Sequence, residues 1–447
     1  MHKYTQFLVS TSLTITLAAC GGSSDTSNQN IGSSQNTASS TKTISLYTLD
    51  RNEQPYQATV VLHDSEGKVI LTQTSDNTGH FSAEVSDNAK HISIIGYSYS
   101  DRKIYTELNI EEGGSLGNFY FYDPKKTSPI APPTSCTWVT VDISELTQVT
   151  YNNYELEYWQ VPLGYDGSRK PLTTSSEICF DPDQETAKSI LFTLTAPNGS
   201  NSTAALITLD ESVTSFQLTS EDFVHEGTLV QPQLSASVNQ VISRSYIEHD
   251  FNHIVSPTND TSIDNLSPIF IFPSITEHNF IYQYANESIN INGADVHLQT
   301  HSRSYINSDG QVKLNELPES IHSLSNDVIN LTQGQSLSYD FSQTDTRFSR
   351  ARWDLSFTIN DENADWYIYG PTSANIPNLE FGDAFPTPTE GIQFWSVRLG
   401  LFGYVDAPTD YLQFRSFVNK RKPNWAFLTQ PEYHQSVGSS IQIYFNH

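Results

Sequence analysis

Residues 353–359 read Trp-Asp-Leu-Ser-Phe-Thr-Ile, so that apolar and polar side chains alternate without interruption. A period of two places all the apolar side chains on one face of an extended chain. The run is therefore predicted to be a β-strand with one buried face and one polar face. Residues 394–399, 411–414 and 440–445 are further strand candidates, and no stretch after residue 20 shows a sustained helical period. The chain is predicted to be all-β.

A series of shorter alternating runs begins at Ile44 and continues to residue 122. Turn-forming residues separate several of them, as in Asp64-Ser-Glu-Gly67 and Glu111-Glu-Gly-Gly114. Short strands at regular spacing with turns between them are typical of a β-sandwich. Residues 44–125 are therefore predicted to form a small β-sandwich.

Two patterns in this first unit resemble a known family. Asn52-Glu-Gln-Pro55 precedes Ala58-Thr-Val60, and Asp76-Asn-Thr-Gly79-His-Phe81 follows. Together they resemble the carboxypeptidase-regulatory-like, or transthyretin-like, repeat, with Ser75-Asp76 in place of the usual Thr-Asp. The resemblance covers about 80 residues and implies a non-catalytic spacer or binding module.

A second unit follows a proline-rich break. Residues 126–135 include Pro129, Pro132 and Pro133 and are predicted to be a linker, since proline stiffens a chain and is kept out of central strands. Residues 136–233 contain further alternating runs and are predicted to form a second β-sandwich. Cys136 and Cys179, the only cysteines besides Cys20, lie in this unit. In an oxidising compartment they are predicted to form a disulfide.

Residues 234–447 show no clear internal break and are predicted to be a β-rich region of one or two units. The pentapeptide Ser-Arg-Ser-Tyr-Ile occurs at residues 243–247 and again at 302–306. Such a repeat is typical of two related β units, and a chance match is the alternative that stays open. The predicted fold is a set of tandem Ig-like or transthyretin-like β-sandwich units after a disordered tether.

The N-terminus has the features of an export signal. Lys3 precedes an apolar run, diluted by Ser and Thr, that ends in Leu17-Ala-Ala-Cys20. This run is too short to span a hydrocarbon core of about 30 Å, and small residues precede its cysteine as a cleavage site requires. It resembles the lipobox of bacterial lipoproteins.

The lipobox resemblance implies a location as well as a modification. Residues 1–19 would be a signal peptide that is removed, Cys20 would be acylated, and Gly21 after it favours the outer membrane. Residues 20–43 consist mostly of Ser, Asn, Thr, Gln and Gly. Such a segment buries too little apolar area to offset its ordering entropy, so it is predicted to be a disordered tether.

The net charge narrows the range of partners. The chain has 23 Lys and Arg against 50 Asp and Glu, and removing residues 1–19 takes away Lys3, which gives 22 − 50 = −28. Nucleic acid is not an expected partner, since phosphate neutralisation needs clustered basic residues. Attraction to anionic lipid is weak for the same reason, so the lipid anchor is the predicted membrane contact. A glycan or an envelope protein is the candidate partner, and no cofactor is predicted.

Two short motifs were considered as metal sites. His249-Asp-Phe-Asn-His253 has the histidine spacing of a zinc protease helix, with Asp where that motif has its catalytic Glu. No third ligand is evident, so surface histidines are the simpler interpretation. Asp361 and Asp365 bracket an oxygen-rich segment that could contribute to a calcium site. A solvated turn is the alternative.

Aromatic residues follow this acidic segment at Trp366, Tyr367 and Tyr369. Exposed aromatic rings on a β-sandwich can stack on the apolar faces of sugars, and packing in a core is the alternative. The leading hypothesis is a non-enzymatic outer-membrane lipoprotein that binds a glycan or serves as a scaffold. The other hypothesis is an envelope hydrolase acting on glycans, which needs two carboxylates about 5–9.5 Å apart, contributed here by dispersed strands.

Overall fold

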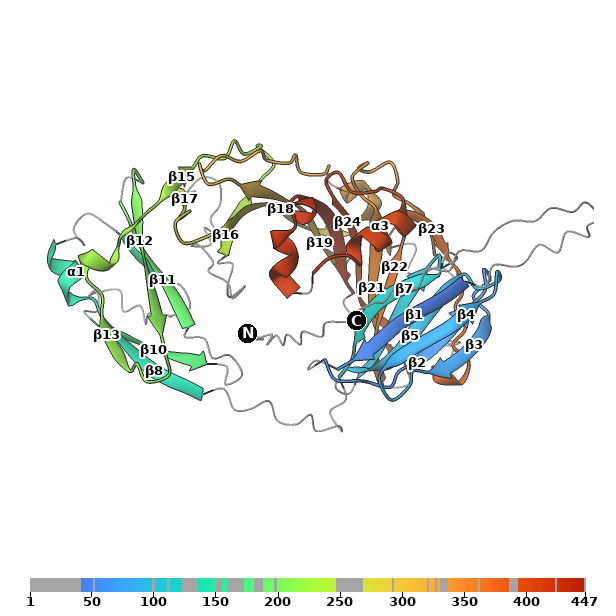
Figure 1. Ribbon diagram of the computed structural model, residues 1–447. Coiled ribbons are helices and arrows are strands. Elements are labelled where there is room, and N and C mark those ends of the chain that lie inside the picture. The colour runs from blue at the N-terminus through green and yellow to red at the C-terminus, as the bar shows by residue number, and fades with distance from the viewer. Residues whose placement is uncertain are drawn as a thin grey trace, which may run out of the picture.

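The computed structural model is all-β, as predicted (Figure 1). It describes residues 42–50, 53–98, 101–110, 113–122, 135–149, 155–158, 173–180, 188–196, 199–246, 268–291, 293–319, 321–325, 328–329, 337–359, 362–385, 393–422 and 424–445. The predicted signal peptide with Cys20, most of the proline-rich linker, His249, His253 and Asp361 lie outside these residues.

One large sheet, here called the central sheet, joins the two ends of the chain. Its strand order is β16-β18-β19-β25-β24-β21-β22-β6-β5-β2-β3. The C-terminal region contributes β16 (Gln240–Tyr246), β18 (His278–Ile291), β19 (Ala294–Ile306), β21 (Arg350–Ile359), β22 (Glu362–Gly370), β24 (Gln393–Tyr404) and β25 (Ser436–Tyr444). The first unit contributes β2 (Thr59–His63), β3 (Val69–Thr74), β5 (His91–Ser98) and β6 (Asp101–Leu108).

The two ends meet where β22 pairs with β6. This pair is parallel, whereas the other neighbouring strands of the central sheet are antiparallel. A second, smaller sheet completes a sandwich in the first unit, with β4 (His80–Val85), β1 (Lys42–Leu49) and β7 (Gly114–Tyr120) in the order β4-β1-β7. Buried apolar residues such as Ile92, Ile94 and Phe121 fill the space between the two layers.

The second unit contains two sheets of its own. The first has the order β10-β8-β13, with β8 (Ser135–Asp142), β10 (Thr173–Phe180) and β13 (Ser215–Gln217). The second has the order β14-β12-β11-β9, with β9 (Glu155–Tyr158), β11 (Lys188–Thr195), β12 (Ser202–Leu209) and β14 (His225–Glu226). Val141, Phe192 and Leu209 belong to one core that draws on both sheets. The helix α1 (Ser144–Val149), the 3-10 helix η1 (Ser220–Asp222) and the pair β15 (Thr228–Val230) and β17 (Ile269–Ile271) lie beside them.

The predicted alternation at residues 353–359 is confirmed in β21, whose residues are alternately buried and half-buried. Trp353, Leu355 and Phe357 belong to the largest core, together with apolar residues of β19, β24 and β25. The segments that cover this side contain β20 (Leu337–Asp340), β23 (Ser373–Ile376) and the 3-10 helices η3 (His322–Leu324) and η4 (Gly382–Ala384). We call this side of the C-terminal strands the packed face.

The opposite side of the same strands is only partly covered. Helix α3 (Tyr411–Val418) lies over it near β24 (Figure 1), together with the 3-10 helices η5 (Asn424–Thr429) and η6 (Pro431–Tyr433). We call the remainder of this side, on β22, β21, β24, β25 and β19, the open face. Its residues are Tyr367, Tyr369, Arg350, Arg352, Asp354, Arg398, Gly400, Ser440, Gln442, Gln299 and His301.

Helix α3 corrects one expectation, because residues 411–414 were predicted to be a strand. The carboxylate of Asp410 caps the helix by accepting a hydrogen bond from the backbone N–H of Gln413. Tyr411 and Phe414 are both buried, at the three-residue spacing of a helical face. A four-residue window is too short to separate this spacing from a strand. None of the helices described is long and apolar enough to cross a membrane.

Candidate functional site

The three aromatic residues predicted to form a sugar platform do not share one face. The Trp366 indole N–H donates a 2.9 Å hydrogen bond to the Thr106 hydroxyl. The ring of Trp366 meets that of Phe381 edge-on at 5.5 Å, within the packed face. Tyr367 and Tyr369 pair with open-face residues of β21. Strand alternation therefore makes Trp366 a packing residue and leaves the two tyrosines on the open face.

The predicted metal ligands also separate. Asp365 accepts a 2.6 Å hydrogen bond from the Ser356 hydroxyl across the β21–β22 pair, and Asp361 lies outside the described residues. In the part of the chain that the structure describes, no group of three or more His, Cys, Asp or Glu residues could hold a metal ion. The contact observed for Asp365 is thus a cross-strand hydrogen bond.

A ladder of tyrosines and arginines crosses the open face. The rings of Tyr105 and Tyr367 stack at 5.3 Å across the β6–β22 pair. The Arg352 guanidinium carbon lies 5.1 Å from the Tyr367 ring centre and 5.5 Å from that of Tyr369. Arg350 lies 5.4 Å from the Tyr369 ring. These distances are within the range of cation–π attraction, which holds the arginines against the rings.

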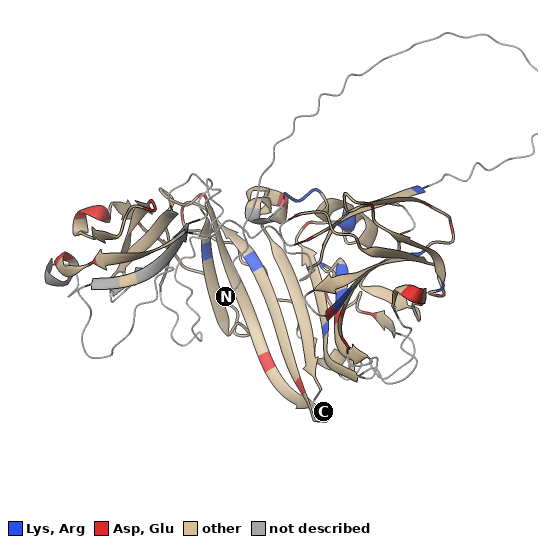
Figure 2. Cartoon of the chain, turned by 90° about the horizontal axis from the view of Figure 1, so that it is seen from below, with Lys and Arg blue, Asp and Glu red and all other residues tan. Residues whose placement is uncertain are grey.

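The arginines of this face lie beside carboxylates. Arg352 donates through Nε to an Asp354 oxygen at 2.5 Å. Arg398 lies directly opposite Asp354 in the β21–β24 register, is exposed, and forms no ion pair with any described residue. Figure 2 shows basic residues on the strands of the central sheet itself. In a chain of net charge −27, three arginines on two neighbouring strands are a distinctive feature.

Two glycines shape the floor between these side chains. Gly400 lies opposite Arg352 on one side and Ser440 on the other. A Cβ atom at Gly400 would meet only the Arg352 carbonyl oxygen, at 3.9 Å, so the space above it is open. At Gly438 the same atom would lie 2.3 Å from the His301 ring, which fills that space.

Helix α3 closes one end of the open face. The Tyr411 hydroxyl donates a 2.6 Å hydrogen bond to Glu107 on β6. The amide of Asn419 donates a 2.7 Å hydrogen bond to the Ser115 carbonyl on β7. Burial raises the pKa of Glu107, against the opposing effects of Tyr411 and Arg415. The helix is thereby fixed to the first unit.

Three carboxylates on this side of β6, β22 and β21 accept hydrogen bonds. Glu107 accepts from Tyr411, Asp354 from Arg352, and Asp365 from Ser356. Glu107 is half-buried and lies against α3 through its bond to Tyr411. An acid and a nucleophile for glycoside hydrolysis must both reach the sugar. Asp354 and Asp365 are half-buried, and Glu107 is bonded to α3.

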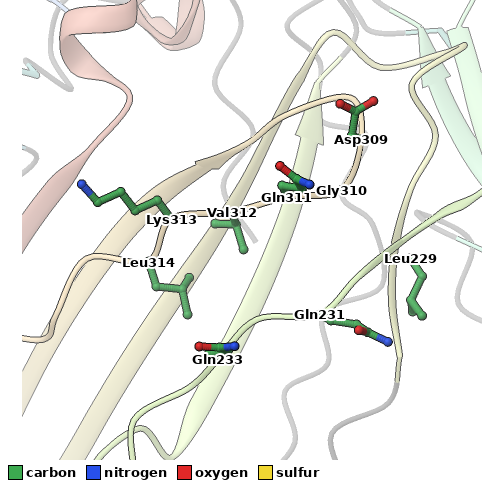
Figure 3. Close-up of a pocket in the computed structure, with 9 residues that line it drawn as sticks. All are labelled: Leu229, Gln231, Gln233, Asp309, Gly310, Gln311, Val312, Lys313 and Leu314. Atoms are coloured by element: carbon green, nitrogen blue, oxygen red, sulfur yellow. The ribbon is translucent and has the colours of Figure 1, made fainter.

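A separate pocket of about 580 Å³ lies between the segment after β15 and the loop after β19 (Figure 3). Its lining residues are Leu229, Gln231, Gln233, Asp309, Gly310, Gln311, Val312, Lys313 and Leu314. It has one carboxylate, one amine and no aromatic ring among them. It therefore offers neither a stacking surface nor a paired acid and base.

Comparison with known proteins gives no family for the chain. No protein-family model matches the sequence, and a search of curated proteins found no match.

Sequence reasoning missed the arginines of the open face. Arg350, Arg352 and Asp354 occur at alternate positions, immediately before and within the run that began the sequence analysis. Period two places them on the polar face of that strand. The signal was therefore present, but the polar face was interpreted only as solvent-exposed.

Proposed function

We propose that the protein is a lipid-anchored, non-enzymatic binding protein of the outer membrane whose ligand is a glycan. The observation that carries this proposal is the open face, where Tyr367 and Tyr369 lie half-buried beside Arg352. On the other side of β21, a Cβ atom at Gly400 would meet only the Arg352 carbonyl oxygen, at 3.9 Å. Aromatic rings supply stacking surface and guanidinium groups supply fixed hydrogen-bond donors. Sugars present both an apolar ring face and hydroxyl acceptors to such a surface.

The tyrosine hydroxyls suit this role. Burial, followed by the nearby charges of Asp365 and Asp354, raises the pKa of Tyr367 to about 12. Burial also raises the pKa of Tyr369. Both phenols therefore stay protonated at neutral pH and can donate to a sugar oxygen.

The anchor and the disulfide complete the proposal. Acylation of Cys20 would hold the protein on the membrane, at the end of the tether of residues 20–43. The β8–β10 register pairs Cys136 directly with Cys179. Residues opposite each other in an antiparallel pair have Cα atoms about 4.5–5.5 Å apart, which is within the range that a disulfide spans. This supports the proposed bond in the second unit.

Glycan binding is tested by calorimetric titration of the full-length protein, purified from membranes in detergent, with a panel of neutral and acidic polysaccharides. We expect Tyr367→Ala and Tyr369→Ala to weaken binding at least tenfold, since aromatic contacts contribute about 0.5–1.5 kcal/mol beyond area burial. Tyr47→Ala is the matched control, because Tyr47 is 45% exposed on β1, away from the open face. If no polysaccharide binds the wild type, the proposal is wrong.

Anchoring is tested separately by metabolic labelling with palmitate and by membrane fractionation. The Cys20→Ser variant should lose the label and leave the outer-membrane fraction. Retention of both in the variant would contradict the proposed anchor.

A further inference from the structure

We infer that the glycan bound by the open face is acidic, and that Arg352 and Arg398 hold the carboxylate of a uronic-acid residue. This inference rests on the proposed function and adds the chemical class of the ligand.

The arrangement of charge is the first support. Arg350, Arg352 and Arg398 lie on two adjacent strands, and Asp354 is the carboxylate between them. Its ion pair occupies the Nε of Arg352. The Arg352 side chain is 41% exposed and that of Asp354 is 18% exposed. A ligand that approaches from solvent therefore meets guanidinium groups before it meets the carboxylate.

The spacing of the arginines is the second support. Arg352 is opposite Gly400, and Arg398 is two positions before Gly400 on the same strand. Such diagonal neighbours lie about 7–8 Å apart, within reach of long side chains that converge on one group. Guanidinium groups match the planar carboxylate and bind it with two parallel hydrogen bonds. Asp354 acts as a positioning residue, since its bond to Nε holds the Arg352 fork over Tyr367.

The open floor is the third support. A side chain at Gly400 would project between these groups, and nothing closer than 3.9 Å occupies that space. Tyr367 and Tyr369 lie on β22, two strands from Gly400, with β21 between them. A polysaccharide that crosses β21 can bring one sugar to the tyrosines and the carboxylate of a neighbouring sugar to Arg352 and Arg398. The tyrosines and the arginines then recognise neighbouring residues of one polymer.

The negative net charge of the protein favours a ligand whose own negative charges are widely spaced along its length. Duplex DNA carries one charge for about every 1.7 Å of its axis, and a chain of net charge −27 repels such a ligand outside the contact. A polyuronate has one carboxylate per sugar and an uncharged ring between carboxylates. Local contact with Arg352 and Arg398 can then outweigh the general repulsion.

The test compares one polymer in two forms, a polyuronate and its methyl ester, by titration of the full-length protein. Esterification keeps the sugar ring and removes the charge. We expect the free acid to bind about 10–100-fold more tightly, as a charge-assisted hydrogen bond contributes about 1.5–3 kcal/mol. Equal affinity for the two forms would overturn the inference and leave the proposed glycan binding in place.

Substitutions of single arginines show which side chains bind the carboxylate of the polyuronate. Arg398→Gln and Arg352→Gln should remove most of the preference for the free acid while leaving affinity for the ester within about threefold. Arg102→Gln is the matched control, because Arg102 pairs with Glu362 and lies opposite Ala364 of the packed face. An unchanged preference in both open-face variants would overturn the assignment.

Further polymers separate this inference from the proposed function. Tighter binding of a sulfated polysaccharide, or of a neutral one, than of the polyuronate would overturn the uronate assignment alone. Binding of single-stranded nucleic acid without any glycan would overturn both proposals.

Discussion

The packed face and the open face belong to the same strands, yet the first is apolar and the second carries charged and aromatic residues. On β21, Trp353 and Leu355 enter a continuous apolar core, while Arg352 and Asp354 between them form an ion pair on the other side. One face is fully covered by segments of the C-terminal region. The other is covered at one end by α3 and open over Gly400.

This difference shows which aromatic residues can serve a ligand. Trp353 and Trp366 contribute to the stability of the sheet, whereas Tyr367 and Tyr369 keep surface in contact with solvent. Contiguous exposed apolar patches often mark binding sites, whereas single exposed rings are common on protein surfaces. The following substitutions compare the two faces, beginning with the largest expected effect.

Trp353→Ala should destabilise the protein by about 3–5 kcal/mol, because it removes a fully buried side chain and leaves a cavity. Thr358→Ala, on the other face of the same strand, should cost about 0.5 kcal/mol or less. Urea unfolding of both variants measures the difference. Equal losses would mean that the packed face does not carry the stability of the sheet.

Trp366→Ala and Tyr367→Ala separate stability from binding at adjacent positions. Trp366→Ala should cost about 2–3 kcal/mol, through its core contacts and its hydrogen bond to Thr106, and should leave glycan affinity nearly unchanged. Tyr367→Ala should cost about 1 kcal/mol or less and weaken binding. The two are compared by unfolding and by titration with the same polysaccharide. If Trp366→Ala weakened binding and Tyr367→Ala lowered only the stability, the packed face and not the open face would bind the ligand.

Two glycines of the open side offer a comparison within that side. Gly438→Ala should cost about 1–3 kcal/mol, because the new Cβ would strike the half-buried His301 ring. Gly400→Ala meets only open space, so its stability should stay within about 0.5 kcal/mol of wild type. Thermal unfolding distinguishes them. A large loss of stability in Gly400→Ala would show that other atoms fill the space above Gly400.

Histidines on the two faces should make stability depend on pH in the same direction. Burial lowers the pKa of His63, on the packed side, and of His301, on the open side, to about 4. The His301 pKa is lowered further by Arg303 and Arg398. In the folded protein both pKa values lie below the ordinary 6.5, so the unfolded chain binds protons more readily than the folded one. The free energy of unfolding is therefore highest above pH 6.5 and decreases as the pH falls toward 4.

Each histidine should therefore account for about 1–2 kcal/mol of the loss between pH 7 and pH 5. Unfolding at these two pH values, for the wild type and for His63→Asn and His301→Asn, measures the contributions. The variants should lose less stability than the wild type over this interval. An identical loss in all three proteins would show that neither histidine is titrated on unfolding.

Local sequence pattern predicted the strands well where the period of two was regular. The run at residues 353–359 is confirmed as part of β21 because its alternation depends only on neighbouring residues. The same rule, applied to residues 366–369, separates Trp366 from the two tyrosines. The sequence analysis grouped them by composition and so joined residues of opposite faces.

Other features depend on contacts between distant residues. The parallel pairing of β6 with β22 joins Ile104 to Trp366 in register, and no local pattern specifies which strand edge another will meet. The burial of Glu107 likewise depends on Tyr411, which lies far along the chain. The first four residues of the repeated pentapeptide, Ser-Arg-Ser-Tyr, lie on β16 and β19, which both flank β18. Arg244 and Arg303 of the two copies both lie near the Tyr282 ring.

Hydroxyl-radical footprinting of the full-length protein, with and without saturating polyuronate, tests most directly whether the open face binds the ligand. Without the polymer, Tyr367 and Tyr369 should be oxidised and Trp353 should be protected. Adding the polymer should slow oxidation of the two tyrosines and leave exposed Tyr47 unchanged. Unaltered oxidation of Tyr367 and Tyr369 at saturation would contradict the account.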